Sequence, residues 1–311
     1  MPNHKDLRIL FLGTPEFAAA ILQKLIDEKA NVVAVVTMPD KPSGRGLQMH
    51  SSAVKQVAEA NGLKILQPEK LKNEAFLEEL RLLNIDLGIV VAFRMLPEVV
   101  WRLPRLGTFN LHGSLLPQYR GAAPINWAII NGETKTGVTT FFLQHEIDTG
   151  DLLLQEEEPI RPEDNAGTLY VRLMHRGANL VWKTLEGVAN ESLVPIPQKE
   201  EAAKTAPKIH RDTCQLDFLQ KAQDIHNKIR GLSPFPGAFT ILDGKILKIG
   251  LTEIGEDRPI NIPPSELRQL APGELAFSTS DKWLLIKELQ PEGKRKMTAK
   301  EFLAGHQIQK L

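Results

Sequence analysis

Cysteine is nearly absent from this sequence: Cys214 is the single one among 311 residues. One cysteine can form neither an internal disulfide nor a zinc site built from thiolates, so both are excluded. No apolar run approaches the roughly 20 residues of a membrane-spanning helix, and the polar start Met-Pro-Asn-His-Lys-Asp does not resemble a signal peptide. We therefore expect a protein of the reducing cytoplasm with a hydrophobic core of its own.

Net charge is absent as well. The 38 Lys and Arg side chains balance 38 Asp and Glu, whereas a protein that coats nucleic acid without specificity is strongly basic. Residues 1–206 carry 22 basic and 25 acidic side chains, and residues 207–311 carry 16 and 13. The positive excess, which favours contacts with phosphate groups, therefore lies in the second part of the chain.

Motifs for nucleotide cofactors are missing too. The segment Leu10-Phe-Leu-Gly-Thr-Pro15 has only the first glycine of a Gly-x-Gly-x-x-Gly fingerprint. Without the other two glycines the backbone cannot approach a pyrophosphate closely, which disfavours NAD. The sequence has no Walker motif, and its eight histidines show no His-x-x-x-His spacing, so we expect no metal.

Apolar runs alternate with amphipathic segments in the first part of the chain. Buried strands are expected at residues 7–12, 31–37, 86–92, 107–111 and 137–143. Helices are expected at residues 15–29, 51–61, 71–83 and 167–189, with a loop at residues 38–50. Strands that alternate with helices form a mostly parallel sheet covered on both faces, so the sequence predicts a doubly wound, Rossmann-like α/β domain.

The composition and periodicity of the sequence change after residue 189. Residues 190–208 are polar, contain three prolines and show no period, which indicates a linker. Beyond residue 209, an opening helix precedes short apolar segments separated by Gly, Pro, Asp and Asn, as in a small barrel or sandwich. We therefore expect a first domain at residues 1–189, a linker at 190–208 and a β-rich domain at 209–311.

Asn110 and His112 stand two residues apart at the end of a predicted strand. Alternate residues of a strand point to the same face, and ligands bind at the carboxyl ends of strands in such sheets. A neutral histidine accepts a proton and an asparagine amide donates a fixed hydrogen bond, which suits attack of an amine on a carbonyl-level carbon. The alternative is a strand-end histidine bonded to loop backbone.

A second polar site is the turn Glu146-Ile-Asp-Thr-Gly-Asp151, between two apolar runs. A carboxylate behind a catalytic histidine sets its tautomer and orientation, which is the role that Asp148 would have here. The alternative is an aspartate that caps the turn. We interpret the nearby acidic run Glu156–Glu158 as a solvated stretch.

Three segments of this half resemble the 10-formyltetrahydrofolate-dependent formyltransferases: Asn110-Leu-His-Gly-Ser-Leu-Leu-Pro117, Tyr119-Arg-Gly-Ala-Ala-Pro124 and Asp148-Thr-Gly150. Within that family the chain is similar to the members that formylate methionyl-tRNA for translation initiation. Three more segments carry the narrower likeness: Phe11-Leu-Gly-Thr-Pro-Glu-Phe17, Pro39-Asp-Lys-Pro-Ser-Gly-Arg-Gly46 and Pro234-Phe-Pro-Gly-Ala238. The resemblance covers both expected domains.

The resemblance implies a catalytic trio of Asn110, His112 and Asp148. Asn110 and protonated His112 would stabilise the oxyanion on the formyl carbon, and Asp148 would orient the imidazole. The proton lost by the methionyl amine would reach the departing folate nitrogen through His112 or a held water. The co-substrate, 10-formyltetrahydrofolate, would bind beside the turn formed by Ser114, Leu115, Leu116 and Pro117.

The resemblance also implies initiator methionyl-tRNA as the partner of a monomeric enzyme. The loop at residues 38–50 would contact the acceptor end of the tRNA through Lys41, Gly44, Arg45 and Gly46. The C-terminal domain would be an OB-like barrel, with possible phosphate contacts from Lys294, Arg295, Lys296 and Lys300. Phe17 would line the methionyl pocket. The alternatives are that the loop at residues 38–50 and the basic cluster are simply solvated, and that Phe17 is a core residue on the face of a helix.

The sequence departs from the pattern of the family at two places. Ala53 stands where the family often has proline, and Phe93-Arg-Met95 replaces a Tyr-Gly segment beside the folate pocket.

Three other functions are alternatives. Formylation of an amino sugar or of glycinamide ribonucleotide is disfavoured by the loop at residues 38–50 together with the C-terminal domain. Binding of tRNA without catalysis is disfavoured by the intact trio, and nucleotide-dependent oxidation by the missing glycines.

Overall fold

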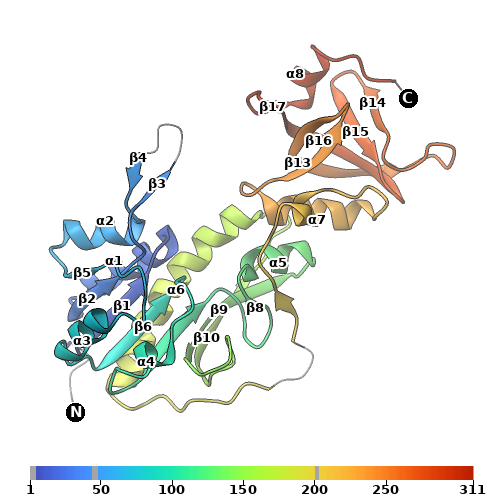
Figure 1. Cartoon of the computed structure of the whole chain (residues 1–311). Coiled ribbons are helices and arrows are strands. Elements are labelled where there is room, and N and C mark those ends of the chain that lie inside the picture. Colours follow the sequence, from blue (N-terminus) through green and yellow to red (C-terminus); the bar gives the residue numbers. More distant parts are fainter. Residues whose placement is uncertain (1–4, 44–47, 200–202, 311) are drawn as a thin grey trace. The chain divides into compact units, whose positions relative to one another are not determined.

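The structure, a computed structural model, describes residues 5–43, 48–199 and 203–310 (Figure 1). The chain forms two compact units. The first comprises residues up to 121, 137–158 and 170–205, and the second comprises residues 122–136, 159–169 and 206 onward. The predicted boundaries, a domain at 1–189 and another at 209–311, remain a prediction.

The first unit is built on a seven-stranded sheet. Its strands, in spatial order, are β10 (Leu152–Pro159), β9 (Lys135–Phe142), β7 (Thr108–His112), β6 (Leu87–Val91), β1 (Ile9–Gly13), β2 (Val32–Val36) and β5 (Ile65–Leu66). The pairs from β7 to β5 are parallel, and β9 runs antiparallel to β7. The expected doubly wound, mostly parallel sheet is therefore confirmed.

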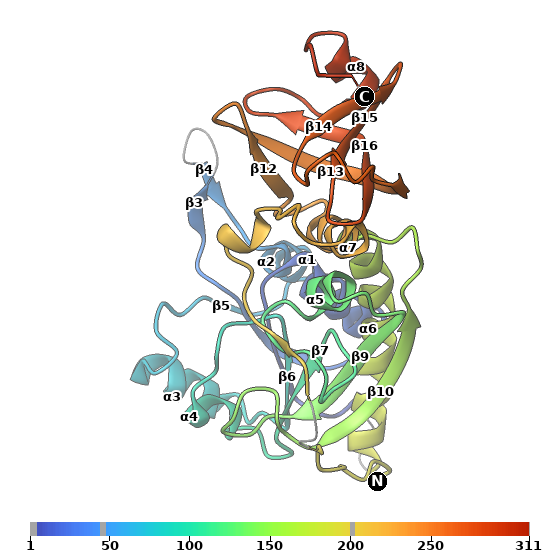
Figure 2. The same cartoon turned by 90° about the vertical axis from the view of Figure 1, so that its right-hand side faces the viewer.

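Helices cover both faces of this sheet (Figure 2). They are α1 (Glu16–Asp27), α2 (Ala53–Ala60), α3 (Glu74–Leu82), α4 (Glu98–Trp101) and α6 (Ala166–Ala189). The helices α2 and α3 begin at N-caps, because the side chain of Ser52 accepts from the Lys55 amide and that of Asn73 accepts from the Phe76 amide. One face of the sheet buries alternate residues of β1, Leu10 and Leu12, against α3 and α4. All five residues of β1 are buried, as the continuous apolar run in the sequence predicted for a strand covered on both faces.

The expected loop at residues 38–50 contains two short strands. They are β3 (Lys41–Ser43) and β4 (Gln48–His50), which pair as an antiparallel hairpin. Asp40, at the base of the hairpin, accepts from the Lys55 ammonium at 2.5 Å and from the Gln67 amide at 2.9 Å. These hydrogen bonds, chiefly that from Lys55, lower the pKa of Asp40. The predicted tRNA contacts Gly44, Arg45 and Gly46 lie outside the described residues.

The second unit is rich in antiparallel strands, as expected. Its main sheet runs in the order β12 (Ala238–Leu242), β13 (Lys245–Asp257), β16 (Lys282–Pro291), β15 (Glu274–Ser278) and β14 (Leu267–Ala271), and β17 (Met297–Thr298) pairs with β16. The helices of this unit are α5 (Pro124–Ile130), α7 (Ala222–Leu232) and α8 (Ala299–Leu303). Ile225 and Ile229 of α7 share one buried cluster with Leu247 of β13 and Leu284 of β16. The unit therefore has a core of its own.

Backbone pairing occurs within the expected linker. Ile196 exchanges two backbone hydrogen bonds with Leu152, of 2.8 and 2.9 Å. Further along, β11 (Thr205–Ala206) pairs with β8 (Arg120–Gly121). The expected linker thus pairs with the start of β10 through Ile196, and its end pairs with β8, the short strand that follows β7.

Candidate functional site

Asn110 and His112 occupy the carboxyl end of β7, in the interior of the sheet. Their registered partners in β9 are Phe141 and Thr139. Asn110 is half-buried and His112 is 6% exposed. The shared face expected from their spacing of two residues follows from the strand that the structure assigns here.

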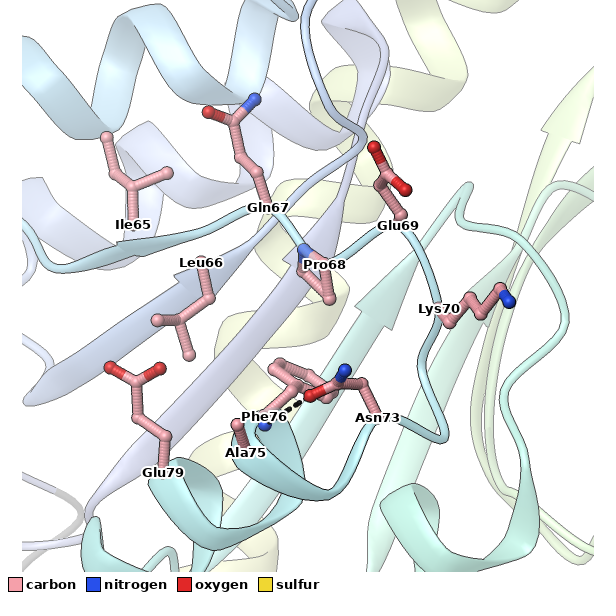
Figure 3. A pocket seen from close by; sticks show the side chains of 10 residues that line it. All are labelled: Ile65, Leu66, Gln67, Pro68, Glu69, Lys70, Asn73, Ala75, Phe76 and Glu79. Atoms are coloured by element: carbon pink, nitrogen blue, oxygen red, sulfur yellow. Dashed lines mark hydrogen bonds between the residues drawn. The ribbon is translucent and has the colours of Figure 1, made fainter.

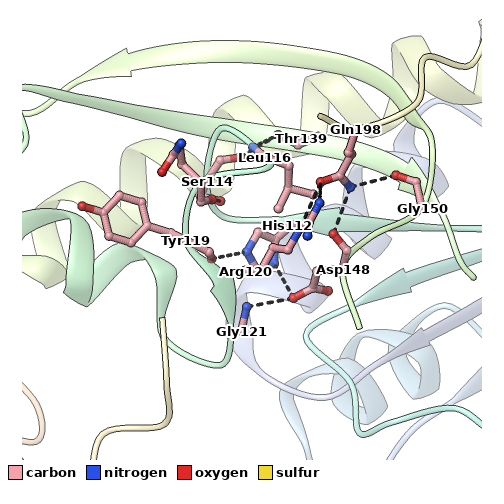
Figure 4. Close-up of polar contacts among 11 residues, drawn as sticks. His112, Ser114, Leu116, Tyr119, Arg120, Gly121, Thr139, Asp148, Gly150 and Gln198 are labelled. Carbon is pink, nitrogen blue, oxygen red and sulfur yellow. Dashed lines mark hydrogen bonds and ion pairs between the residues drawn. The ribbon is translucent and has the colours of Figure 1, made fainter. Parts of the chain in front are cut away.

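The two ring nitrogens of His112 have different surroundings (Figure 4). Nε2 lies 2.8 Å from the carbonyl oxygen of Tyr119. A carbonyl oxygen can only accept, so Nε2 carries a proton and donates it. Nδ1 lies 3.8 Å from Oδ2 of Asp148. The histidine is thus bonded to loop backbone through one nitrogen, while the other nitrogen faces a carboxylate and is the one that can exchange a proton.

Asp148 lies in a strained turn that the surrounding chain supports. Its φ angle is +56°, in the left-handed region. Its Oδ2 accepts a hydrogen bond of 2.9 Å from the amide of Gly121. Two residues later, a side chain on Gly150 would place its Cβ 1.6 Å from the carbonyl oxygen of Phe142. Only glycine fits there, which gives the Asp-Thr-Gly sequence a physical reason.

The predicted folate segment has two buried and two partly exposed residues. Ser114 is fully buried and its carbonyl accepts from the Thr139 hydroxyl at 2.6 Å. Leu116 is 3% exposed, and its carbonyl accepts from the Gln155 amide at 2.7 Å. Leu115 and Pro117 are half-buried. The hydrogen bonds from Thr139 and Gln155 therefore fix the shape of the turn, while Leu115 and Pro117 retain accessible surface.

Phe17 packs in the interior of the first unit. It is 6% exposed, and its ring meets that of Tyr170 edge to face at 5.2 Å. The Tyr170 hydroxyl accepts a hydrogen bond of 2.9 Å from the Phe17 amide, and burial raises the pKa of this hydroxyl. These contacts give Phe17 the surroundings of a core residue; its role in a methionyl pocket stays a prediction.

The predicted basic residues differ in their partners. Lys41 is exposed on β3. In the second unit, Arg295 pairs with Glu301 at 2.7 Å and Lys296 pairs with Glu288 at the same distance. The run of basic residues from Lys294 to Lys300 is thus partly neutralised by acids that follow or precede it in the chain.

An open groove of about 720 Å³ lies between β5 and α3 and is lined by residues between Ile65 and Glu79 (Figure 3). Its polar side chains come from Gln67, Glu69, Lys70, Asn73 and Glu79. The Gln67 amide is engaged with Asp40 and with the carbonyl of Met38. The side chains that line the groove include no histidine, serine, threonine or cysteine, so the chemistry points to the end of β7.

In the part of the chain that the structure describes, no group of three or more His, Cys, Asp or Glu side chains could hold a metal ion. Within the same residues, no helix has both the length and the apolar character to cross a membrane.

One residue that sequence reasoning missed is Gln198. Its amide nitrogen donates to the carbonyl oxygens of Asp148 at 2.9 Å and of Gly150 at 2.8 Å. Its amide oxygen accepts from Arg120. Gln198 lies in the aperiodic segment taken as a linker, so no pattern in the sequence singled it out.

Comparisons with known proteins match both parts of the chain to one family. The profile of the formyl transferase family matches residues 7–185, and that of its C-terminal domain matches residues 208–307. The chain is 52% identical to a methionyl-tRNA formyltransferase of Parabacteroides distasonis, over 97% of this chain and 96% of the relative. It is 48% identical to the one of Flavobacterium johnsoniae, over 97% of this chain and 96% of that relative.

Solved structures show the same fold. An N-formyltransferase from Helicobacter canadensis, in complex with folinic acid and dTDP-3-aminofucose, superposes with a TM-score of 0.68 at 21% identity, over 92% of this chain and 99% of that one. HypX from Aquifex aeolicus, in complex with tetrahydrofolic acid, superposes with a TM-score of 0.64 at 20% identity, over 98% of this chain and 48% of that one. By its sequence along nearly its whole length, this chain belongs to the formyl transferase family.

Proposed function

We propose that this chain transfers the formyl group of 10-formyltetrahydrofolate to the free amino group of initiator methionyl-tRNA, giving N-formylmethionyl-tRNA for translation initiation. The observation that carries the proposal is the 52% identity, along 97% of the chain, with a methionyl-tRNA formyltransferase. Relatives of that name match both the part that holds Asn110, His112 and Asp148 and the strand-rich second unit. The N-formyltransferase in complex with dTDP-3-aminofucose shares the fold at 21% identity, which is no argument that this chain acts on a sugar nucleotide.

The geometry at the end of β7 suits this reaction. The amine attacks the formyl carbon, an oxyanion develops, and the bond to the folate nitrogen breaks as that nitrogen receives a proton. In our proposal the Asn110 amide donates to the oxyanion, and His112 exchanges the proton through Nδ1, because its Nε2 is committed to the Tyr119 carbonyl. Asp148, 3.8 Å from Nδ1, stabilises the protonated ring.

The proposal extends to the other predicted contacts. The folate lies beside Ser114, Leu115, Leu116 and Pro117, and Phe17 borders the methionyl side chain. The acceptor end of the tRNA meets Lys41, Gly44, Arg45 and Gly46. Residues 1–189 form the catalytic domain, residues 190–208 a linker, and residues 209–311 an OB-like barrel that binds tRNA. The enzyme acts as a monomer in the cytoplasm.

A direct assay tests the proposal. Purified protein is mixed with methionyl initiator tRNA and 10-formyltetrahydrofolate, and formylmethionine is measured after release by mild base. Loss of one oxyanion donor costs about 10²–10³ in rate and loss of a general acid or base about 10²–10⁴. We therefore expect Asn110→Ala and His112→Ala each to lose at least about 100-fold in turnover. His175→Ala, an exposed histidine of α6, is the matched control and should behave as wild type.

Acceptor specificity separates the competing functions. Methionyl initiator tRNA should be formylated in preference to an amino sugar nucleotide and to glycinamide ribonucleotide. Folate binding without tRNA formylation, together with formylation of a small amine, would show that the family is right and the proposed acceptor wrong. Near-normal turnover of His112→Ala would remove the proposed site.

A further inference from the structure

The side-chain amide of Gln198 uses all of its hydrogen-bonding directions on one set of partners (Figure 4). Nε2 donates to the carbonyl oxygens of Asp148 and Gly150, at 2.9 and 2.8 Å. Oε1 accepts from Nε and Nη2 of Arg120, at 3.1 and 2.7 Å. A planar amide held at both ends in this way cannot rotate without breaking bonds. It therefore fixes the Asp148 turn relative to Arg120.

The two loops that this amide joins are the ones that hold His112. The loop with Arg120 supplies the carbonyl of Tyr119, which accepts a hydrogen bond from His112 Nε2, and the amide of Gly121, which donates to the Asp148 carboxylate. The other loop supplies Asp148 itself, at a φ of +56° that the backbone does not favour on its own. The distance between His112 Nδ1 and the carboxylate thus depends on how the two loops are joined.

We propose that Gln198 and Arg120 form a clamp that positions the Asp148 carboxylate against His112 for formyl transfer. The inference rests on the proposed function of this site and adds two positioning residues to it. Without the clamp, the turn at Asp148 relaxes and the carboxylate loses its fixed distance to the imidazole. Small displacements of groups in an active site lower the rate of the chemical step more than they weaken the binding of substrate.

The clamp is separable from the stability of the unit. Gln198 is half-buried and its neighbours Pro197 and Lys199 are exposed. The same segment has an independent attachment, because the amide of Lys204 donates to the Gln118 side chain at 2.9 Å and the amide of Tyr119 donates to the Lys204 carbonyl. A substitution at Gln198 therefore leaves the segment in place.

The test compares Gln198→Met and Gln198→Glu with Lys199→Ala as the exposed neighbour control. Met keeps the length without polar atoms, and Glu keeps an acceptor for Arg120 but cannot donate to the two carbonyls. Both variants should lose about 10- to 100-fold in kcat, with KM for tRNA and folate within about threefold and an unchanged melting temperature. Arg120→Met should lose kcat in the same range.

Combination with Asp148→Asn identifies the route of the effect. A clamp that acts through the carboxylate has nothing left to position in that background, so Gln198→Met should then cost less than about twofold more. A full additional loss, unchanged kcat in Gln198→Met, or a parallel fall of melting temperature and kcat would each overturn the clamp. Wild-type protein that makes no formylmethionyl-tRNA would instead overturn the proposed function, and with it the role of the clamp in that reaction.

Discussion

Nδ1 of His112 lies 3.8 Å from Oδ2 of Asp148, while Nε2 of the same ring is bonded to the carbonyl oxygen of Tyr119 at 2.8 Å. The carbonyl fixes the proton on Nε2, so a second proton can enter only at Nδ1, on the side of the carboxylate. The negative charge of Asp148 is itself held by the Gly121 amide. A histidine so placed can become an imidazolium during the reaction without moving.

Replacement of the carboxylate tests this arrangement. Asp148→Asn keeps the size and the turn propensity but removes the charge that stabilises a protonated ring. We expect kcat to fall by about 100-fold or more, since a histidine that acts in proton transfer contributes about 10²–10⁴. Single-turnover rates of formylation measure this, and circular dichroism checks the fold. Asp151→Asn, in the same turn, is the control; equal losses in both variants would contradict a specific role for Asp148.

A methyl group at Gly150, unlike Asp148→Asn, would disrupt the backbone of this turn. The Cβ of Gly150→Ala would lie 1.6 Å from the carbonyl oxygen of Phe142, a backbone atom of the sheet that cannot rotate away. We expect a loss of about 3 kcal/mol in the free energy of unfolding, at the upper end of the usual cost of overpacking. Urea denaturation measures it. Gly305→Ala, whose Cβ would have its nearest neighbour at 4.0 Å, should change stability by less than about 0.5 kcal/mol.

Patterns of a few neighbouring residues in the sequence predicted the positions of Asn110, His112 and Asp148. Asn110 and His112 share a face because a strand alternates with a period of two, and the apolar run before them marks the strand. The turn of Asp148 follows from its polar sequence between apolar runs. Gln198 could not be predicted, because its partners Arg120 and Asp148 are 78 and 50 residues away along the chain. Nothing in an aperiodic segment indicates where it will fold back.

The fold shows the same limit. Most long β-strands and helices of the first unit lie close to their predicted positions. The eight-residue strand β10 was missed because its second half is acidic, and the three-residue strands β3 and β4 were missed because they carry too little pattern. The charged run from Lys294 to Lys300 suggested a phosphate-binding surface. Its pairing with Glu288 and Glu301 depends on a strand and a helix that bring those acids alongside.

The interpretation of Glu156–Glu158 as a solvated stretch is wrong for Glu158. This residue is 5% exposed and receives hydrogen bonds from Arg172 at 2.8 Å and from Arg176 at 2.7 Å. Burial alone would raise the pKa of Glu158, but the two guanidinium groups outweigh it and the pKa is lowered. Its charged form thus stabilises the fold at neutral pH, and this contribution is lost as the pH falls through the lowered pKa.

Glu158→Gln should therefore be destabilising. The amide removes the negative charge that both guanidinium groups contact, and hydrogen bonds to charged groups contribute about 1.5–3 kcal/mol. We expect a loss of about 2 kcal/mol at pH 7 in urea denaturation. Glu163→Gln, at an exposed position, should be neutral. A Glu158→Gln protein as stable as wild type would show that the buried pair contributes nothing net.

His226 in α7 is half-buried, and its Nδ1 lies 2.9 Å from the hydroxyl of the buried Thr252. Burial, aided by the nearby charge of Arg230, lowers the pKa of His226 from 6.5 to about 4. The unfolded chain therefore binds a proton at a higher pH than the folded chain does, and stability must fall as the pH drops below 6.5 toward 4. The resulting loss in the free energy of unfolding reaches up to about 2 kcal/mol at pH 5.

His226→Gln isolates this effect, because glutamine can still bond to Thr252 but does not titrate in this range. Thermal or urea unfolding is measured from pH 7 to pH 5 for both proteins. Wild type should lose up to about 2 kcal/mol more than the variant over this interval, so the difference between them should close or reverse at low pH. Parallel pH curves for the two proteins would mean that His226 takes up its proton in the folded state as readily as in the unfolded chain.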